Sequence, residues 1–280
     1  MASTRRQVDQ SGTQSIERAI HLLKLLTTRS AFGWGLTELA QRSGLDKATV
    51  HRILGRLERD RLVQRDSQKH RYLPGPMLVE LGLSVSTHHP LLDEGRKTIH
   101  RLAQRTGGVS FFYLRSGTDF VVAGRIEHKA HTGMLNEIGY RRPLIMSAGG
   151  IAMLVAMPAP EREEVVRCNL ADSRQLGVPK IDRFERMLER SLELGYSANL
   201  QDVAAGIHSF AAPILDDALQ PIGSISIAGE PHRFPAAMGR KIVDLLAFEA
   251  AKLGEQSLPQ PRQAYALAQD HAAADYAAVA

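Results

Sequence analysis

The sequence has a single cysteine, Cys168, and one tryptophan among its 280 residues. One cysteine excludes an intrachain disulfide and a cysteine-based metal cluster, and it suits a reducing compartment. No apolar run reaches the roughly 18 residues that a membrane span needs, since the longest candidate covers only residues 151–157. The polar N-terminus carries Arg5 and Arg6 and does not resemble a secretory signal. We therefore expect a cytoplasmic protein with no membrane partner.

Catalytic motifs are missing as well. The chain contains no GxSxG elbow, no HExxH, no P-loop and no GxGxxG that opens a helix. Its 11 histidines show no spacing typical of metal ligands. Cys168 follows Val165 and Val166 on a helical pattern, which favours a small buried hydrophobe over a reactive thiol. We expect no catalytic residue, no metal and no cofactor.

The excess of positive over negative charge is confined to one end of the chain. Residues 1–80 hold 14 Lys and Arg against 8 Asp and Glu, whereas residues 81–280 hold 21 against 22. The net charge of +5 therefore comes from an N-terminal segment with a balance of +6, joined to a near-neutral remainder. This asymmetry indicates a polyanion-binding module attached to a larger part with another task.

Residues 36–73 have the pattern of a helix-turn-helix. A supporting helix is predicted from an N-cap at Ser15, and a short helix from an N-cap at Thr37 to Gly44. Asp46 can cap a third helix, whose apolar residues follow i, i+3, i+4, i+7 spacing. These apolar residues are Val50, Ile53, Leu54 and Leu57.

The opposite face of this third helix is basic. Small residues near its start would let the backbone approach the floor of a major groove, where cations meet guanine acceptors or phosphates. A solvated basic helix face explains the charges equally well. The candidate DNA-binding residues on this face are Lys47, Ala48, Thr49, His51, Arg52 and Arg56.

A basic hairpin follows and favours the DNA-binding interpretation. Two short strands at 62–65 and 70–73 surround a turn at 66–69. Arg65, Lys69 and Arg71 would contact phosphates or enter the minor groove as a wing. A helix-turn-helix with a basic hairpin is more specific than a run of charge, so sequence-specific binding to double-stranded DNA is the leading hypothesis.

The remainder predicts an α/β domain with a mostly antiparallel sheet, which makes the fold class two-domain α+β. Ser147 is an expected N-cap for a helix at 149–157, whose free amides near Ala148 and Gly149 could receive an anion, although most such helices bind nothing. In 222–229, Ser224, Ser226 and Ala228 share one face of a strand. Further predictions are strands at 109–114, 120–126, 144–146, 196–200, 207–215 and 221–228, a loop at 128–142, and helices at 161–169, 181–194 and 237–256.

These elements suggest five segments. Residues 1–14 form a flexible tail, 15–75 the winged helix-turn-helix domain, 76–89 a linker helix, 90–256 the α/β domain, to which the resemblance described next assigns effector binding, and 257–280 a second flexible tail. The linker helix could also dimerise, although a plain amphipathic helix of the second domain fits its pattern almost as well.

Several stretches resemble the isocitrate lyase regulator (IclR) family of bacterial transcription factors, from residue 14 to 255. They are SIERAIHLLKLL, LTELAQRSGLDKATVHRILGRLERDRLV, RYLPG, GYRRPLIMSAGGIAMLVAM and GIHSFAAPILDDALQPIGSISIAG. The resemblance implies operator binding by a homodimer or a dimer of dimers, controlled by a small organic effector. The implied effector-binding residues are Met134, Ala148, Gly149, Asn199, Ser209 and Ser226, with Ala228 close by.

Two positions depart from the family member that binds small keto acids. Asn199 stands where an acid is found, and Ala228 replaces a second serine. The lost hydrogen-bonding capacity favours a different or more apolar effector, such as an aromatic acid. Two other interpretations stay open: an enzyme with a basic N-terminal assembly module, and a purely architectural DNA binder. The sequence does not distinguish a repressor from an activator.

Overall fold

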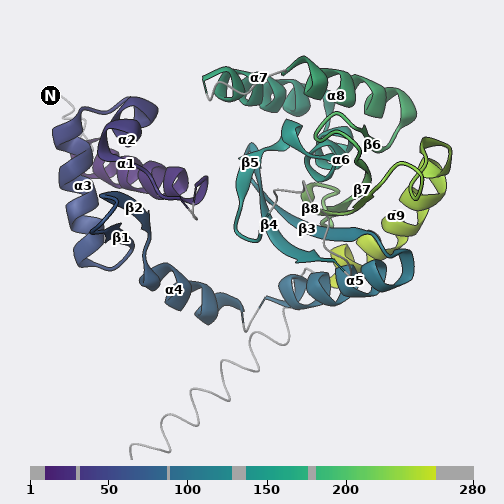
Figure 1. The fold of residues 1–280 in the computed structure, drawn as a ribbon, viewed down its shortest axis with the longest axis horizontal. Helices are drawn as coiled ribbons and strands as arrows, with labels where there is room; N and C mark the ends of the chain where they lie inside the picture. Colours follow the sequence, from purple (N-terminus) through teal and green to yellow (C-terminus); the bar gives the residue numbers. More distant parts are fainter. Residues whose placement is uncertain (1–9, 30–31, 87–88, 128–136, 176–180, 257–280) are drawn as a thin grey trace, which may run out of the picture. The chain divides into compact units, whose positions relative to one another are not determined.

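The computed structural model describes residues 10–29, 32–86, 89–127, 137–175 and 181–256 (Figure 1). Contacts divide the chain into two compact units, one of Met1–His88 with Asn136–Arg142 and one of His89–Leu135 with Pro143–Ala280. No helix within the described ranges is long and apolar enough to cross a membrane. The predicted tail 257–280 and the candidate residue Met134 lie outside the described residues.

The N-terminal unit is the predicted winged helix-turn-helix. Its core is a continuous cluster in which Leu22, Leu39, Val50, Leu54 and Tyr72 are almost fully buried. The predicted apolar stripe of the third helix therefore faces this core, and its basic residues lie on the other side of the helix. The elements are α1 (Gln10–Thr27), α2 (Leu36–Ser43), α3 (Lys47–Arg59), β1 (Val63–Asp66), β2 (Arg71–Pro74) and α4 (Pro76–Ser86).

Helix starts in this unit match the prediction at one position and differ at two. Asp46 is the N-cap of α3, because its Oδ1 accepts a hydrogen bond of 2.8 Å from the amide of Thr49. Thr37 is not the N-cap of α2, since Gly35 holds that position and its amide donates to Oε2 of Glu38 at 2.7 Å. α1 begins at Gln10 and not at Ser15, so the predicted tail 1–14 overlaps a helix. Polar residues without apolar periodicity can extend a helix that is already anchored further along.

The wing is attached to the helices by backbone hydrogen bonds. β1 and β2 pair antiparallel from Val63 opposite Pro74 to Asp66 opposite Arg71. Trp34 and Tyr72 exchange two backbone hydrogen bonds of 2.9 and 2.8 Å, and Trp34 is only 3% exposed. Trp34 is therefore a packing residue, and it fixes the hairpin against the turn between α1 and α2.

The C-terminal unit contains a six-stranded sheet of order β5-β4-β3-β8-β7-β6. The strand pairs β3–β4, β3–β8, β6–β7 and β7–β8 are antiparallel, as the sequence predicted. The strands are β3 (Val109–Ser116), β4 (Asp119–Ile126), β5 (Arg141–Pro143), β6 (Ser197–Leu200), β7 (His208–Leu215) and β8 (Pro221–Gly229). The helices are α5 (Pro90–Thr106), α6 (Ala148–Ala156), α7 (Ala159–Gln175), α8 (Asp182–Leu194) and α9 (Gly239–Gln256), with 3-10 turns η1 (Leu144–Met146) and η2 (Ala236–Met238).

Helices cover both faces of this sheet (Figure 1). On one face, Phe112, Phe210, Ile225 and Ile227 form the main core together with residues of α5 and α9. The opposite face carries α6, where Ala148 and Ala152 pack against Ala211 of β7. Strand alternation therefore separates a large apolar face from a face with small and polar side chains. We call the second one the α6 face.

Four local predictions in this unit are wrong. Residues 144–146 form η1 and not a strand, because their amides are satisfied elsewhere: Leu144 donates to the carbonyl of Thr118, and Ile145 to Oδ1 of Asn169. The predicted loop 128–142 contains the start of β5, and α7 extends well beyond 161–169. Cys168 is half-buried and not fully buried, with its Sγ 3.7 Å from Glu164 Oε1.

Candidate functional site

α3 presents most of the predicted DNA-binding residues to solvent. Lys47, Ala48, His51, Arg52 and Arg56 are exposed, whereas Thr49 is half-buried. Val50 and Leu54 on the opposite side are fully buried. The helix is thus held by its apolar stripe while its basic side remains open to a partner.

Charge on this open face is only partly neutralised. Arg56 pairs with Asp60 one turn later, with Nε and Oδ2 3.2 Å apart. Lys47 and Arg52 have no ion pair with any residue in the described part of the chain. Water and salt screen the attraction of exposed cations to distant charges. These two side chains are therefore available for an incoming phosphate or base.

The wing turn is organised by one aspartate. Oδ1 of Asp66 accepts the amides of Gln68 and Lys69, each at 2.9 Å. These hydrogen bonds, that from Lys69 first, lower the pKa of Asp66 below its ordinary value. The side chains of Arg65 and Lys69 on either side are exposed, and Arg65 lies over the ring of Tyr72 at 5.6 Å. The turn therefore projects two cations from a constrained backbone.

Arg71, the third predicted wing cation, points back into its own domain. Its Nη1 donates to the carbonyl of Gly33 at 2.9 Å and to Oε2 of Glu38 at 3.1 Å. This arrangement indicates a structural use of the guanidinium, because its charge is already compensated by Glu38. No spacing in the sequence reveals this pair, since 33 residues separate the two partners.

The second group of candidate residues is brought together on the α6 face. Asn199 and Ser209 are opposite each other on β6 and β7, and Nδ2 of Asn199 donates to Oγ of Ser209 at 2.9 Å. Ala228 lies opposite Ser209 on β8. Ser226 lies in the neighbouring row, opposite Ala211, and is 1% exposed. The predicted common face of the β8 residues is thereby confirmed.

Asn199 has a second use that the sequence did not indicate. Its Oδ1 accepts the amides of Asp202 at 2.9 Å and Val203 at 3.0 Å, so the side chain stabilises the turn after β6. A carboxylate could accept the same two hydrogen bonds but could not donate to Ser209. The asparagine therefore links the turn to β7 without adding negative charge to this face.

The N-terminal end of α6 packs directly on the sheet. Ser147 is its N-cap, as predicted, with Oγ accepting the Gly150 amide at 2.9 Å. A Cβ atom at Gly149 would lie 2.3 Å from Cδ2 of Tyr113 and 2.8 Å from Oγ of Ser224. Close packing thus explains the glycine without an anion, and it places Ala148 and Gly149 on the α6 face beside β3 and β8.

Other residues of the α6 face were not singled out from the sequence. Phe111 of β3 is opposite Ser226 of β8 and also opposite Arg125 of β4. Phe111 and Tyr113 stack with ring centroids 5.7 Å apart. Alternation along β3 could have placed both rings on one face, but only the register reveals which β8 and β4 residues lie beside them.

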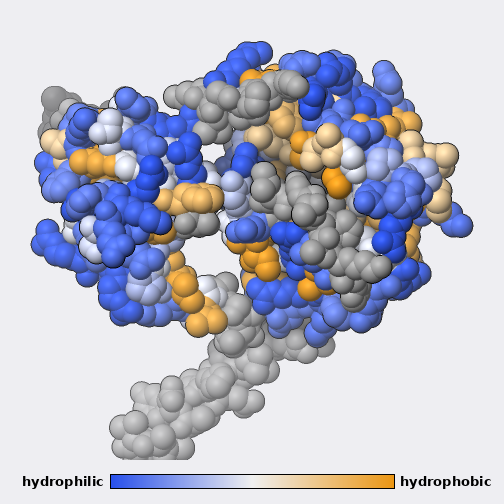
Figure 2. Space-filling view, in the orientation of Figure 1, coloured by the Kyte–Doolittle hydropathy of each residue, from blue (hydrophilic) through white to orange (hydrophobic). Residues whose placement is uncertain are grey.

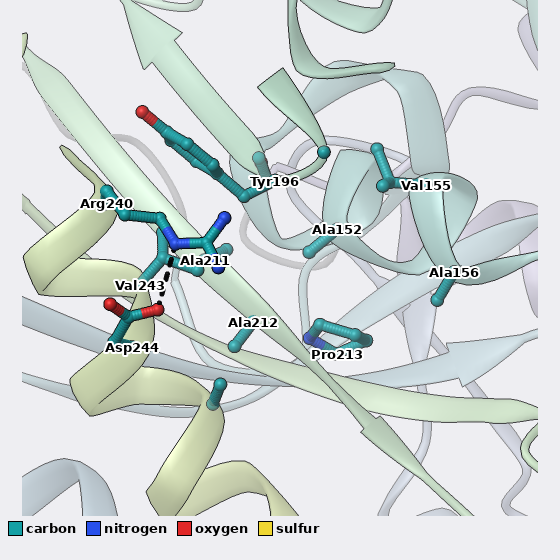
Figure 3. Close-up of a pocket in the computed structure, with 13 residues that line it drawn as sticks. Ala152, Val155, Ala156, Tyr196, Ala211, Ala212, Pro213, Arg240, Val243 and Asp244 are labelled. Atoms are coloured by element: carbon teal, nitrogen blue, oxygen red, sulfur yellow. Dashed lines mark hydrogen bonds and ion pairs between the residues drawn. The ribbon is translucent and has the colours of Figure 1, made fainter. Parts of the chain in front are cut away.

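A cavity of about 370 Å³ lies where β6 begins beside β7 (Figure 3). Ala152, Val155 and Ala156 of α6 line one side of it, and the ion pair of Arg240 with Asp244 on α9 lies on the other (Figure 3). None of the predicted effector-binding residues that the structure describes lines this cavity. Among the described residues, no cluster of three or more His, Cys, Asp or Glu side chains could hold a metal ion.

Comparison with known proteins matches both units. The family described as "Bacterial transcriptional regulator IclR C-terminal" matches residues 83–253, and the "IclR helix-turn-helix domain" matches residues 15–67. The chain is 29% identical to the glycerol operon regulatory protein of Streptomyces coelicolor over 220 residues, which cover 79% of this chain and 86% of that protein.

Solved structures show the same fold. An IclR family transcriptional regulator from Brucella abortus aligns with a TM-score of 0.70 at 20% identity, covering 92% of this chain and 97% of that chain. An IclR homologue from Microbacterium hydrocarbonoxydans, solved in complex with 4-hydroxybenzoate, aligns with a TM-score of 0.60 at 19% identity, covering 86% and 98%. The relatives are regulators and not enzymes, and the helix-turn-helix is a DNA-binding domain. This chain therefore belongs to the IclR family of bacterial transcriptional regulators.

Proposed function

We propose that the protein binds a specific DNA operator as a dimer and that a small organic acid, carboxylic or aromatic, modulates this binding from the α6 face. In this proposal residues 15–75 bind DNA, 76–89 link the domains and 90–256 bind the effector. A regulator of this kind acts in the cytoplasm, where its operator is. The observation that carries the proposal is the exposed, uncompensated pair Lys47 and Arg52 on a helix whose other side is buried.

On the DNA side, Arg52 is the first choice for a base contact, with Lys47 and Thr49 near it. Ala48 allows a close approach, and His51 and Arg56 flank the contact. Arg65 and Lys69 contact phosphates from the wing, whereas Arg71 stabilises the base of the wing. An arginine can bind both acceptors of guanine, so Arg52 can specify a base and also contribute charge.

Dimer formation accounts for the exposed apolar residues of the N-terminal unit. Val79, Leu81 and Leu83 of α4 are 63%, 52% and 63% exposed, and the apolar surface of α4 is visible in Figure 2. Ile16 and Ile20 of α1 are also exposed. A second copy would bury both patches and place two α3 helices about 34 Å apart, one helical turn of DNA. The effector domains could join such dimers into a dimer of dimers.

On the effector side, the polar residues of the α6 face and the end of α6 supply the contacts. Ser226 and Ser209 offer hydroxyl groups, and Ala148 and Gly149 bring the start of α6 close to them. The Microbacterium homologue with bound 4-hydroxybenzoate supports an aromatic acid as the ligand class. A bound ligand changes operator affinity only by its different affinity for the two states of the protein.

Operator binding is tested with Arg52→Ala in the full chain. If Arg52 contacts a base, the variant loses roughly 1 to 3 kcal/mol of operator affinity and tolerates substitution at one base pair. Uniform weakening on all sequences would make it a phosphate contact. Unchanged affinity for every sequence would refute the placement of α3 in the groove. Arg59→Ala, also on α3 but bonded to the Gly55 carbonyl at 3.4 Å, is the matched control.

Effector control is tested with Ser226→Leu, which fills space on the α6 face. The variant should bind the operator with wild-type affinity but lose the response to the effector. Ser226→Ala removes only the hydroxyl group and should weaken the response without affecting the fold. A normal response in both variants would contradict the assignment of this site.

A further inference from the structure

Three chemically different side chains lie in one row across the middle of the α6 face. Arg125 of β4 is opposite Phe111 of β3, and Phe111 is opposite Ser226 of β8. Directly opposed residues of antiparallel strands project to the same face. A cation, an aromatic ring and a hydroxyl group therefore follow one another over two strand spacings, roughly 10 Å.

The aromatic residue of this row, Phe111, belongs to a rigid cluster of three buried rings. The Arg125 guanidinium carbon lies 6.0 Å from the centroid of the Phe111 ring. The ring of Tyr113 stacks on Phe111 at an interplanar angle of 17°, and the edge of Phe120 meets Tyr113 at 5.1 Å between centroids. Phe111, Tyr113 and Phe120 are each at most 3% exposed. Because packing already fixes these rings, a planar ligand that stacks on Phe111 costs little additional side-chain entropy.

Arg125 is a cation whose hydrogen bonding is incomplete. Its side chain is 19% exposed, and Nη2 donates to Oε2 of Glu127 at 2.8 Å. Its Nε is buried and has no hydrogen-bond partner among the described residues. A buried unpaired donor on a charged group is costly, and a planar carboxylate is the group that a guanidinium binds best.

The rest of the row carries no charge. On the far side of Ser226 the row continues with Ala211 and then Ser197, whose Oγ is already bonded to the Ala148 carbonyl at 2.7 Å. The neighbouring Asn199 is neutral, so it does not repel an anion. Arg125 is therefore the one charged residue of this row. Its ion-pair partner, Glu127, lies two residues further along the chain.

We propose, on the basis of the effector function proposed above, that Arg125 selects an aromatic carboxylate as the effector. The carboxylate pairs with the guanidinium, the ring of the ligand stacks on Phe111, and a polar substituent on the opposite side of the ring bonds to Ser226. Arg125 selects ligands that carry a negative charge, and Phe111 selects ligands with a planar ring.

The test uses calorimetric titration of the full chain with matched probes. Benzoate, 4-hydroxybenzoate and phenylacetate are each compared with the corresponding amide, and cyclohexanecarboxylate serves as an acid without an aromatic ring. At least one aromatic acid should bind, its amide at least about tenfold more weakly, and the cyclohexane acid more weakly than benzoate. Arg125→Gln should reduce binding of the acid by about tenfold or more and leave that of the amide unchanged.

Arg115→Gln is the matched control, because Arg115 of the adjacent strand is also 19% exposed and paired with a glutamate, Glu161. It should leave acid binding unchanged. Equal binding of acid and amide, failure of every acid in the panel, or full acid binding by Arg125→Gln would overturn the proposal for Arg125. A response that survives both Ser226 variants would instead overturn the effector site itself, so the two failures are distinguishable.

Discussion

Glu38 of α2 accepts a hydrogen bond from Arg71 of the wing, with Oε2 and Nη1 3.1 Å apart. The same oxygen accepts the amide of Gly35, and Oε1 lies 3.5 Å from Nη1 of Arg29. One carboxylate therefore connects the end of α1, the start of α2 and the wing. Arg29 also lies over the ring of Trp34 at 4.1 Å, so this junction combines ionic and packing contacts.

Arg71→Ala should separate stability from DNA contact. Because Arg71 is bonded within its domain, the variant should lose about 1 kcal/mol of stability but keep the wild-type slope of log K against log salt. Lys69→Ala, which removes an exposed wing cation, should reduce that slope by about 0.9 with little change in stability. Urea unfolding and salt-dependent operator titrations measure the two effects. A shallower slope for Arg71→Ala would show that the arginine also reaches a phosphate.

Acid should weaken the DNA-binding domain through Asp46 and Asp66. Hydrogen bonds from the amide of Thr49 and from that of Lys69, respectively, lower the pKa of each carboxyl below its ordinary value in the folded state. Their stabilising contribution is therefore present above about pH 4, the unfolded value, and is lost as the pH falls through the folded pKa.

Melting curves of Asp46→Asn and Asp46→Ala between pH 6 and pH 2.5 check this expectation. Asparagine caps a helix without titrating, so Asp46→Asn should flatten the acid dependence while keeping most of the stability at neutral pH. Asp46→Ala should lose stability at neutral pH as well. An unchanged acid dependence in both variants would exclude Asp46 as a source of it.

The DNA-binding domain was predictable because its signals are local. The apolar spacing of Val50, Leu54 and Leu57 and the cap at Asp46 lie within 12 residues, and the structure agrees with both. The same holds for β8, where alternation alone places Ser224 and Ser226 on one face. Residues 144–146 show the limit of such signals, because their partners Thr118 and Asn169 are far away in the sequence.

The neighbours of the candidate effector residues could not be predicted in the same way. Phe111 and Ser226 are opposite each other although 115 residues separate them, and that register depends on the pairing of β3 with β8. A one-residue shift would move every side chain of a strand to the other face. Arg125 therefore acquires its meaning only from the folded sheet, and the same is true of Arg71 beside Glu38.

Gly149→Ala should destabilise the C-terminal unit. The added Cβ would overlap the ring of Tyr113, which is itself held by Phe111 and Phe120, so the ring cannot move away freely. Overpacking of this kind costs roughly 1 to 3 kcal/mol. Gly55→Ala in the middle of α3 is the control, because a Cβ there meets nothing within 4 Å. It should be neutral or stabilising by up to about 1 kcal/mol, since alanine favours helices. Equal melting temperatures for wild type and Gly149→Ala would show that α6 is not in close contact with Tyr113.

The cavity beside β7 offers a different place for a ligand and can be tested by filling it. Ala247 of α9 is exposed and lines this cavity. A tryptophan there should block it, yet Ala247→Trp should keep the full effector response, because none of Arg125, Phe111 and Ser226 lines the cavity. Ala251→Trp, one turn further along the same exposed side of α9, is the control for the added bulk.

Calorimetric titration with the aromatic acid that binds the wild type best would decide between the two places. The row of Arg125, Phe111 and Ser226 continues through Ala211 to Ser197, and these last two residues do line the cavity. A large ligand could therefore extend from the row toward it. If Ala247→Trp abolishes binding while Ala251→Trp does not, the effector lies in the cavity, and Arg240 replaces Arg125 as the cation nearest to it. Unaltered binding in both variants would keep the effector at Ser226, where the only cation of the row is Arg125.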